Sequence, residues 1–218
     1  MSVLEQYIDG EIHVPANIDN TKGNRETDEL VVITAEYAVG VNDLSDHEPL
    51  VKQCIDMMMS DKNSSQLLEW VTAYLIGCVP LEGKHGRDCV DLNTGIEKEI
   101  KPKKYTETPT DGGAVFNDYT RKRWEKDKAV NLPIVQSYWV NGRVQYIVEF
   151  PFSAIADRLE EQIIRTCEER NNDYVRNAGW TYKHWINHCT VHYVSKTELQ
   201  KNQGAFNKKL YMELMKRK

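Results

Sequence analysis

Two apolar segments joined by Asn141-Gly142 limit what this chain can fold into more than any other feature of its sequence. The segments are 134–140 (IVQSYWV) and 144–150 (VQYIVEF), and both are rich in β-branched and aromatic residues. An Asn-Gly pair between two such runs is the strongest short-range signal for a β-hairpin, because both turn positions require positive φ angles. The sequence therefore predicts two adjacent antiparallel strands here.

Helical and extended patterns alternate around this hairpin. Apolar residues recur at helical spacing over 67–78, where Ser64 or Ser65 is placed to cap the helix, and over 153–170. The other predicted elements are helices at 50–59 and 119–130 (capped by Asp118 or Thr120), strands at 88–92 and 96–101, a strand or short buried element at 30–41, and a turn-rich loop at 105–118. This order predicts an α/β fold with a mixed central β-sheet flanked by helices.

A length of 218 residues suits one domain. We expect residues 1–218 to form it, with an acidic N-terminal arm at 1–50, the core at 51–170 and an aromatic and basic region at 171–218. Residues 1–50 hold two basic and eleven acidic residues, so residues 51–218 carry a net positive charge although the whole chain has a net charge of −5. A polyanionic partner is therefore compatible with the acidic total.

The composition, with 40% hydrophobic and 28% charged residues, indicates a globular chain with a buried core. No apolar run approaches the roughly 20 residues of a membrane helix, and no signal sequence is visible, so we expect a cytoplasmic protein, or a nuclear one if the host has a nucleus, with no membrane contact. The five scattered cysteines indicate free thiols. A GxSxG elbow, a Walker loop and zinc-finger or helix-turn-helix signatures are absent.

The clearest chemical pattern lies in the acidic segment 88–101 (DCVDLNTGIEKEIK). Residues 93–95 (NTG) form the predicted turn between its two strands, and Pro102 is expected to end the second strand. Because side chains alternate along a strand, Glu99 and Lys101 share one face. The segment thus predicts a carboxylate and an ammonium group side by side on a sheet.

An acid on the preceding strand, Asp88 or Asp91, can reach the same spot as Glu99. Two carboxylates beside a lysine suit a hard cation such as Mg²⁺, for which Mn²⁺ can substitute. Such an ion activates water and stabilises charge at phosphorus, while Lys101 can orient or deprotonate that water. These parts are the ones that phosphodiester hydrolysis needs. The alternative is an ordinary ion pair on an exposed strand.

Residues 86–103 (GRDCVDLNTGIEKEIKPK) resemble the active-site hairpin of the PD-(D/E)XK nuclease superfamily, which includes many type II restriction endonucleases. The family pattern is an Asp, a short hairpin and then Glu-x-Lys. By that resemblance Asp88, or Asp91 as the second choice, binds the metal together with Glu99, and Lys101 acts on the water. The resemblance also implies a core like that of the restriction endonucleases.

The activity implied is a Mg²⁺-dependent endonuclease that hydrolyses phosphodiester bonds of double-stranded DNA at a specific site. Arg87 stands where the family commonly has Pro, and Glu69 is either an acid that reaches the site from a helix or an ordinary surface residue. The alternatives are a phage, homing or structure-specific DNA nuclease, or a non-catalytic nucleic-acid-binding protein in which Glu99 and Lys101 form a structural ion pair.

Basic and hydrogen-bonding residues follow the hairpin, where a DNA backbone would run. The predicted DNA contacts are Lys103, Lys104, Asn117, Tyr119, Arg121, Lys122 and Arg123. The preceding Gly112-Gly113 is either a loop that contacts the backbone or an ordinary surface loop. A palindromic recognition site would require a twofold homodimer.

His184, His188 and His192 recur every four residues around Cys189, a spacing that would suit zinc on an unbroken helix. Residues 190–194 (TVHYV) favour a strand instead, which would separate His192 from the others. Contact with DNA and aromatic packing, on the core or at a dimer interface, are the alternatives for this region.

Overall fold

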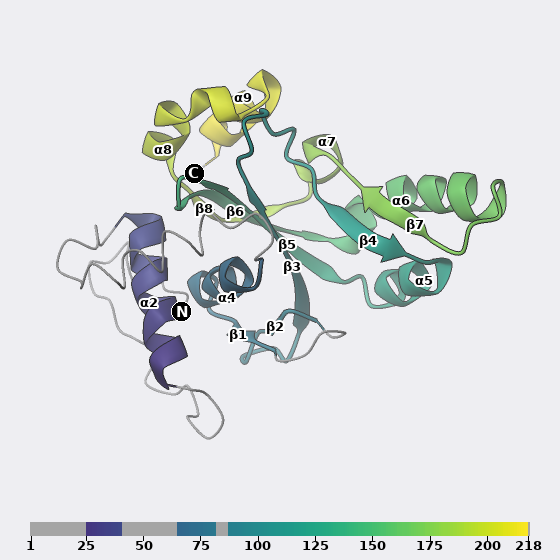
Figure 1. The fold of residues 1–218 in the computed structure, drawn as a ribbon, viewed down its shortest axis with the longest axis horizontal. Helices are drawn as coiled ribbons and strands as arrows, with labels where there is room; N and C mark the ends of the chain where they lie inside the picture. Colours follow the sequence, from purple (N-terminus) through teal and green to yellow (C-terminus); the bar gives the residue numbers. More distant parts are fainter. Residues whose placement is uncertain (1–24, 41–64, 82–86, 218) are drawn as a thin grey trace.

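A computed structural model describes residues 25–40, 65–81 and 87–217 (Figure 1). Its centre is a six-stranded sheet in the order β1-β2-β3-β5-β6-β8. These strands are β1 (Val79–Pro80), β2 (Cys89–Val90), β3 (Glu97–Lys104), β5 (Pro133–Val140), β6 (Arg143–Pro151) and β8 (Thr190–Val194). Only β3 and β5 run parallel, so the sheet is mixed. A separate antiparallel ribbon consists of β4 (Val115–Tyr119) and β7 (Val175–Gly179).

Helices cover both faces of the central sheet, which confirms the predicted α/β fold with a mixed sheet flanked by helices. One face packs against α2 (Arg25–Val39) and α4 (Gln66–Leu75). The other packs against α5 (Arg121–Ala129), α6 (Ala156–Ile163), α7 (Tyr182–Trp185), α8 (Lys196–Lys201) and α9 (Lys208–Lys216). Short 3₁₀ segments lie at Phe152–Ala154 and Gln203–Ala205, and a π-helical turn, Ile164–Glu168, continues α6.

The hairpin of β5 and β6 forms as the sequence predicts. Asn141 and Gly142 both have positive φ angles, of 49° and 74°, and Val140 pairs with Arg143 across the turn. The two strands are nearly buried throughout, because apolar layers cover both of their faces. The hairpin is therefore interior to the sheet, with β3 and β8 on its outer sides.

The parallel pair of β3 and β5 is connected through β4 and α5. The side chain of Thr120 caps α5 by accepting a hydrogen bond from the backbone N–H of Arg123 at 3.1 Å. β3 continues through Pro102 to Lys104, so the prediction that Pro102 ends the strand is wrong. The nitrogen of Pro102 faces the side of β3 on which β2 lies, and β2 pairs with β3 only at Glu97 and Lys98. No backbone hydrogen bond to β2 is therefore lost at Pro102, so the strand tolerates the proline.

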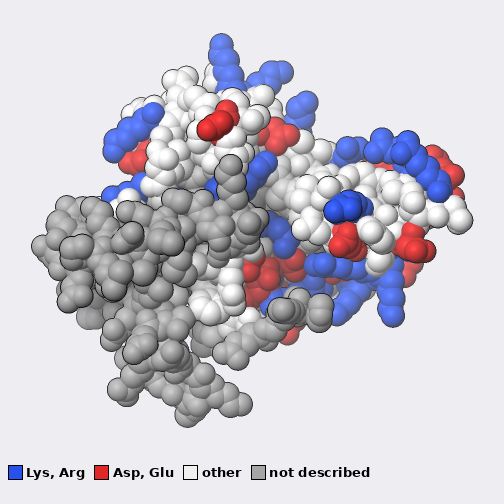
Figure 2. Space-filling model, viewed as in Figure 1, with Lys and Arg blue, Asp and Glu red and all other residues white. Residues whose placement is uncertain are grey.

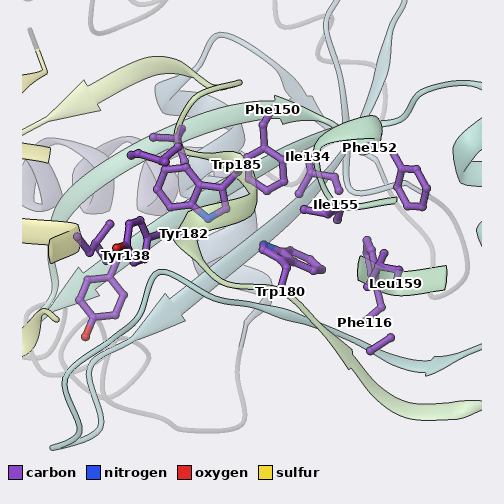
Figure 3. Close-up of a cluster of buried hydrophobic side chains, with 14 of the residues drawn as sticks. Phe116, Ile134, Tyr138, Phe150, Phe152, Ile155, Leu159, Trp180, Tyr182 and Trp185 are labelled. Atoms are coloured by element: carbon purple, nitrogen blue, oxygen red, sulfur yellow. The ribbon is translucent and has the colours of Figure 1, made fainter. Parts of the chain in front are cut away.

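The aromatic residues near the C-terminus belong to the larger apolar core (Figure 3). Phe150 and Trp185 stack with ring centroids 5.9 Å apart, and Trp180 lies edge-on to Phe150. The indole N–H of Trp185 donates to the carbonyl oxygen of Gly112 at 2.8 Å, and that of Trp180 donates to Gln136 Oε1 at 3.1 Å. Of the alternatives for this region, packing on the core is the one that the structure supports for these two tryptophans.

The Gly112-Gly113 segment is buried beneath those indoles, so it is neither of the exposed loops that the sequence suggested. A Cβ at Gly113 would lie 2.2 Å from the carbonyl oxygen of Trp180. Glycine is required there because the two backbones approach so closely. The segment is thus a packing element that holds β4 against the core.

Several predicted boundaries differ from the structure. Residues 30–39 continue α2 and form no strand; helical Thr34, Ala35 and Ala38 are buried against the sheet face that α4 also covers. The predicted loop at 105–118 contains most of β4, which needs β7 from far along the chain as its partner. The predicted strand at 88–92 shortens to Cys89–Val90. The predicted helix at 50–59 and most of the acidic arm lie outside the described residues.

Within the described residues, no helix is long and apolar enough to cross a membrane. Cys78, Cys89, Cys167 and Cys189 are free thiols, as their scattered positions predict.

Candidate active site

The register of β2 on β3 decides which acid faces Glu99. Cys89 pairs with Lys98 and Val90 with Glu97, so the next position of the ladder brings Asp88 beside Glu99 on the same face. The backbone N–H of Asp88 donates to the carbonyl oxygen of Lys98 at 3.1 Å. Oδ2 of Asp88 accepts a hydrogen bond from the backbone N–H of Ile100 at 2.6 Å. The sheet itself therefore holds Asp88 next to Glu99.

Asp91 lies on the opposite face of the hairpin. Its Oδ1 accepts the backbone N–H of Asn93 at 2.9 Å and so shapes the turn, and its Oδ2 lies 4.0 Å from Nζ of Lys98. Lys98 also donates to Glu149 at 2.9 Å. Of the two acids that the sequence left open, only Asp88 is placed with Glu99 by the ladder.

Lys101 lies against Glu99, as the alternation along β3 predicts. Its ammonium group donates to Glu99 Oε1 at 2.6 Å and lies 5.3 Å from the ring centroid of Phe116 in β4. The Lys101 side chain is 22% exposed, whereas that of Glu99 is 5% exposed. The lysine is thus the partly exposed member of this ion pair, and the carboxylate is the buried member.

Two arginines complete the surroundings of Glu99. Arg123 of α5 donates to Glu99 Oε1 at 3.0 Å, and its guanidinium group lies over the rings of Phe116 and Tyr119. Nη1 of Arg87 lies 3.7 Å from Glu99 Oε2, beyond hydrogen-bond distance. Glu99 Oε2 is the one buried side-chain oxygen or nitrogen in the described part of the chain with no hydrogen-bond partner.

The two carboxylates differ in their electrostatic environments. Burial and then the nearby charge of Glu99 raise the pKa of Asp88 from 3.8 to about 6, and the charge of Glu69 adds to this increase. Burial alone would raise the pKa of Glu99, but the Lys101 ammonium and the two guanidinium groups bring it below its ordinary value. The pair therefore combines a firmly ionised acid with one that resists ionisation.

The donor set suits a hard cation with few protein ligands. Asp88 and Glu99 supply carboxylate oxygens, and Glu99 Oε2 has no hydrogen bond to give up. No group of three or more His, Cys, Asp or Glu residues positioned to hold a metal is found among the described residues. Mg²⁺ is commonly bound through one or two protein carboxylates, with water and phosphate completing its sphere, so this pair fits it.

The predicted DNA contacts divide into available and occupied side chains. Asn117 and Lys122 are exposed and therefore available. Lys103 is occupied, because its Nζ donates to the carbonyl oxygen of Gly113 at 3.2 Å. Arg121 pairs with both Glu160, at 3.0 Å, and Glu168. Lys104 is partly buried.

Tyr119 is not placed as a DNA contact. Its side chain is buried, and its hydroxyl donates to Asp127 Oδ2 at 2.8 Å. The prediction that Tyr119 contacts DNA is therefore corrected: its ring is buried and stacks on the ring of Phe116.

The histidines of the C-terminal region are held apart by other contacts. His184 accepts the backbone N–H of Thr181 at 3.1 Å at the start of α7, whereas His192 lies in β8 and contacts Glu149 at 2.9 Å. The strand at 190–194 forms as predicted and separates His192 from the other two.

Arg87 and Asp127 are the two residues of the site whose roles the sequence did not reveal. Arg87 was visible only as a departure from the family's Pro. Asp127 is concealed within the charged helix RKRWEKDKA, although it follows Trp124 by three residues on the buried side of α5. That spacing was the available signal, because a charged residue on a buried helix face needs a partner.

Acidic side chains gather over β3 in the middle of the molecule, with basic side chains beside them toward α5 (Figure 2). No protein-family model matches the sequence, and no curated protein matches it closely enough to indicate a relative.

Proposed function

We propose that this protein is a Mg²⁺-dependent endonuclease that hydrolyses phosphodiester bonds of double-stranded DNA. The observation that carries the proposal is the buried carboxylate of Glu99. One of its oxygens binds Lys101, the other lacks a hydrogen bond, and Asp88 stands beside it on the neighbouring strand. A catalytic lysine and two acids that converge on one spot are the parts that the proposed reaction requires.

Asp88 and Glu99 would hold the cation. When bound there, it would supply Lewis acidity toward a phosphate oxygen and toward water. The charge of the cation would also oppose the burial and the repulsion by Glu99 that together raise the pKa of Asp88.

Lys101 is the residue that we assign to the water. The Lys101 side chain is partly exposed. Its ammonium group is ion-paired with Glu99 and lies over the ring of Phe116. From this position it can orient a water molecule or stabilise the charge that develops at phosphorus. Arg123, which also contacts Glu99 and is 38% exposed, is placed to add positive charge toward a phosphate.

Recognition of a specific short site is the second part of the proposal. Lys103 and Lys104 of β3, Asn117 of β4 and Lys122 of α5 would contact the DNA around the site. Arg121 would do so only by leaving its ion pairs with Glu160 and Glu168. A palindromic site would be bound by a twofold homodimer. The molar mass from light scattering, measured with and without an oligonucleotide that contains the cleavage site, would test whether the protein is a dimer.

A plasmid assay tests the activity itself. The protein is incubated with several supercoiled DNAs in Mg²⁺ or in excess chelator, beside the variants Glu99→Gln and Glu97→Gln. Glu97 is an exposed acid on the same strand and provides the matched control. We expect discrete fragments from wild type and Glu97→Gln in Mg²⁺, and intact DNA from Glu99→Gln and from all samples in chelator.

A non-catalytic nucleic-acid-binding protein is the second candidate. The 2.6 Å contact between Lys101 and Glu99 is the structural ion pair that this candidate requires. Folded wild-type protein that binds DNA without cutting it in Mg²⁺ or Mn²⁺ would favour this candidate. A smear of products would support nuclease activity but would contradict cleavage at a specific site.

A further inference from the structure

Arg87 lies between two carboxylates and hydrogen bonds to only one of them. Its Nη2 donates to Asp127 Oδ1 at 2.8 Å, whereas its Nη1 is 3.7 Å from Glu99 Oε2. The Arg87 side chain is 11% exposed, so solvent offers it little alternative. The position of this guanidinium group therefore depends on which carboxylate holds it.

Asp127 is the carboxylate that holds it. The Asp127 side chain is fully buried on α5, and its Oδ2 accepts the hydroxyl of Tyr119 at 2.8 Å and lies 3.7 Å from Nε of Arg123. Each oxygen of Asp127 therefore has a hydrogen-bond partner, and the carboxylate is anchored on the helix. An anchored, buried anion binds a guanidinium group strongly.

The oxygen of Glu99 that remains without a hydrogen bond follows from this arrangement. Buried carboxylate oxygens almost always have a partner, and a guanidinium group only 3.7 Å away could supply one. Arg87 does not do so: Nη2 of its guanidinium group is held by Asp127, and in that position Nη1 stays 3.7 Å from Glu99 Oε2. The same contact thus satisfies Asp127 and leaves Glu99 Oε2 buried without a hydrogen-bond partner.

We infer that Asp127 is a positioning residue that holds Arg87 away from Glu99 Oε2 and so keeps that oxygen available to Mg²⁺. The inference rests on the proposed function, because it takes Glu99 as a metal ligand. Without the charge of Asp127, Arg87 is free to form a charge-assisted hydrogen bond with Glu99, and a cation must then displace it. Residues behind the ligands commonly change metal affinity by about 10–100-fold when they are substituted.

Mg²⁺ affinity of the DNA-free protein, measured by titration calorimetry, tests the inference without reference to activity. The variants are Asp127→Asn, Arg87→Gln and the double substitution, with Glu149→Gln as the matched control. Glu149 is an ion-paired acid that contacts Lys98 on the opposite face of β3. The double-substitution cycle isolates the coupling between Arg87 and Asp127.

We expect Asp127→Asn to weaken Mg²⁺ binding by about tenfold or more. Adding Arg87→Gln to that variant should restore most of the affinity, since the competing group is gone. Arg87→Gln alone should bind Mg²⁺ at least as tightly as wild type, and Glu149→Gln should match wild type. General damage to the fold would not be repaired by removing a second charged residue.

Each contrary result has its own meaning. If wild type neither binds Mg²⁺ nor cleaves DNA, the proposed function fails. If wild type does both, and Asp127→Asn binds Mg²⁺ normally or is not rescued by Arg87→Gln, the inference about Asp127 fails alone. Should Asp127→Asn not fold, Arg87→Gln decides the question by itself, because weakened Mg²⁺ binding in that variant would mean that Arg87 assists the site.

Discussion

The backbone N–H of Ile100 donates a 2.6 Å hydrogen bond to Oδ2 of Asp88, so the candidate site is built into the sheet. β2 ends its pairing with β3 near this point, and a side-chain carboxylate takes the place of the next backbone acceptor. The acid is thereby fixed beside Glu99 without relying on a flexible loop. The positions of both carboxylates follow from the register of one hairpin.

We predict that Asp88→Asn abolishes Mg²⁺-dependent cleavage, while Asp91→Asn leaves it largely intact. Asp88 faces Glu99, whereas Asp91 shapes the turn on the other face. Plasmid cleavage rates for the two variants, at matched folded concentration, provide the measurement. Loss of activity in Asp91→Asn with full activity in Asp88→Asn would reverse the assignment.

Lys101→Ala is expected to retain DNA binding and to lose cleavage by about 10²–10⁴-fold, because the proposed mechanism assigns the ammonium group beside Glu99 to the water and not to DNA affinity. Gel-shift titration in Ca²⁺ gives the affinity, and single-turnover cleavage in Mg²⁺ gives the rate. Lys126→Ala, at an exposed position of α5, is the control. Unchanged turnover in Lys101→Ala would remove this lysine from the mechanism.

The stability of the metal-free protein should depend on pH through Asp88. Its pKa is raised to about 6 in the folded protein, so folding favours the protonated acid. The contribution of this raised pKa to the free energy of unfolding is fully present below the unfolded-state pKa near 3.8 and is lost as pH rises through about 6. A shift of this size corresponds to roughly 3 kcal/mol at most.

Urea unfolding in chelator at pH 5 and pH 7.5 measures this effect. The free energy of unfolding of wild type, relative to that of Asp88→Asn, should be larger at pH 5 than at pH 7.5. An equal difference at both pH values would show that Asp88 titrates normally.

Gly113→Ala should destabilise the fold by about 1–3 kcal/mol or prevent it from forming, because the added Cβ would meet the Trp180 carbonyl oxygen at 2.2 Å. At Gly204 the same change meets no atom within 4 Å. Thermal unfolding of the two variants makes the comparison. Similar melting temperatures would mean that the backbone near Trp180 adjusts easily.

Local patterns in the sequence anticipated much of this fold. The Asn141-Gly142 hairpin, the helix predicted over 67–78 and the turn at 93–95 each depend on neighbouring residues alone, and all three form, although the helix ends at Leu75. The pairing of β4 with β7 did not show in the sequence, since residues 115–119 become a strand only through residues 175–179. Pro102 was misread for a related reason: whether a strand tolerates proline depends on what lies along that edge.

From the sequence alone came the residue types of the candidate site and the shared face of Glu99 and Lys101, because alternation along a strand is a property of the backbone itself. Tertiary structure decided the choice of Asp88 over Asp91, the burial of Tyr119 and the hold of Asp127 on Arg87. These depend on the register between strands and on a helix that packs against the sheet. Arg87 and Asp127, for example, lie 40 positions apart, and no local pattern records their contact.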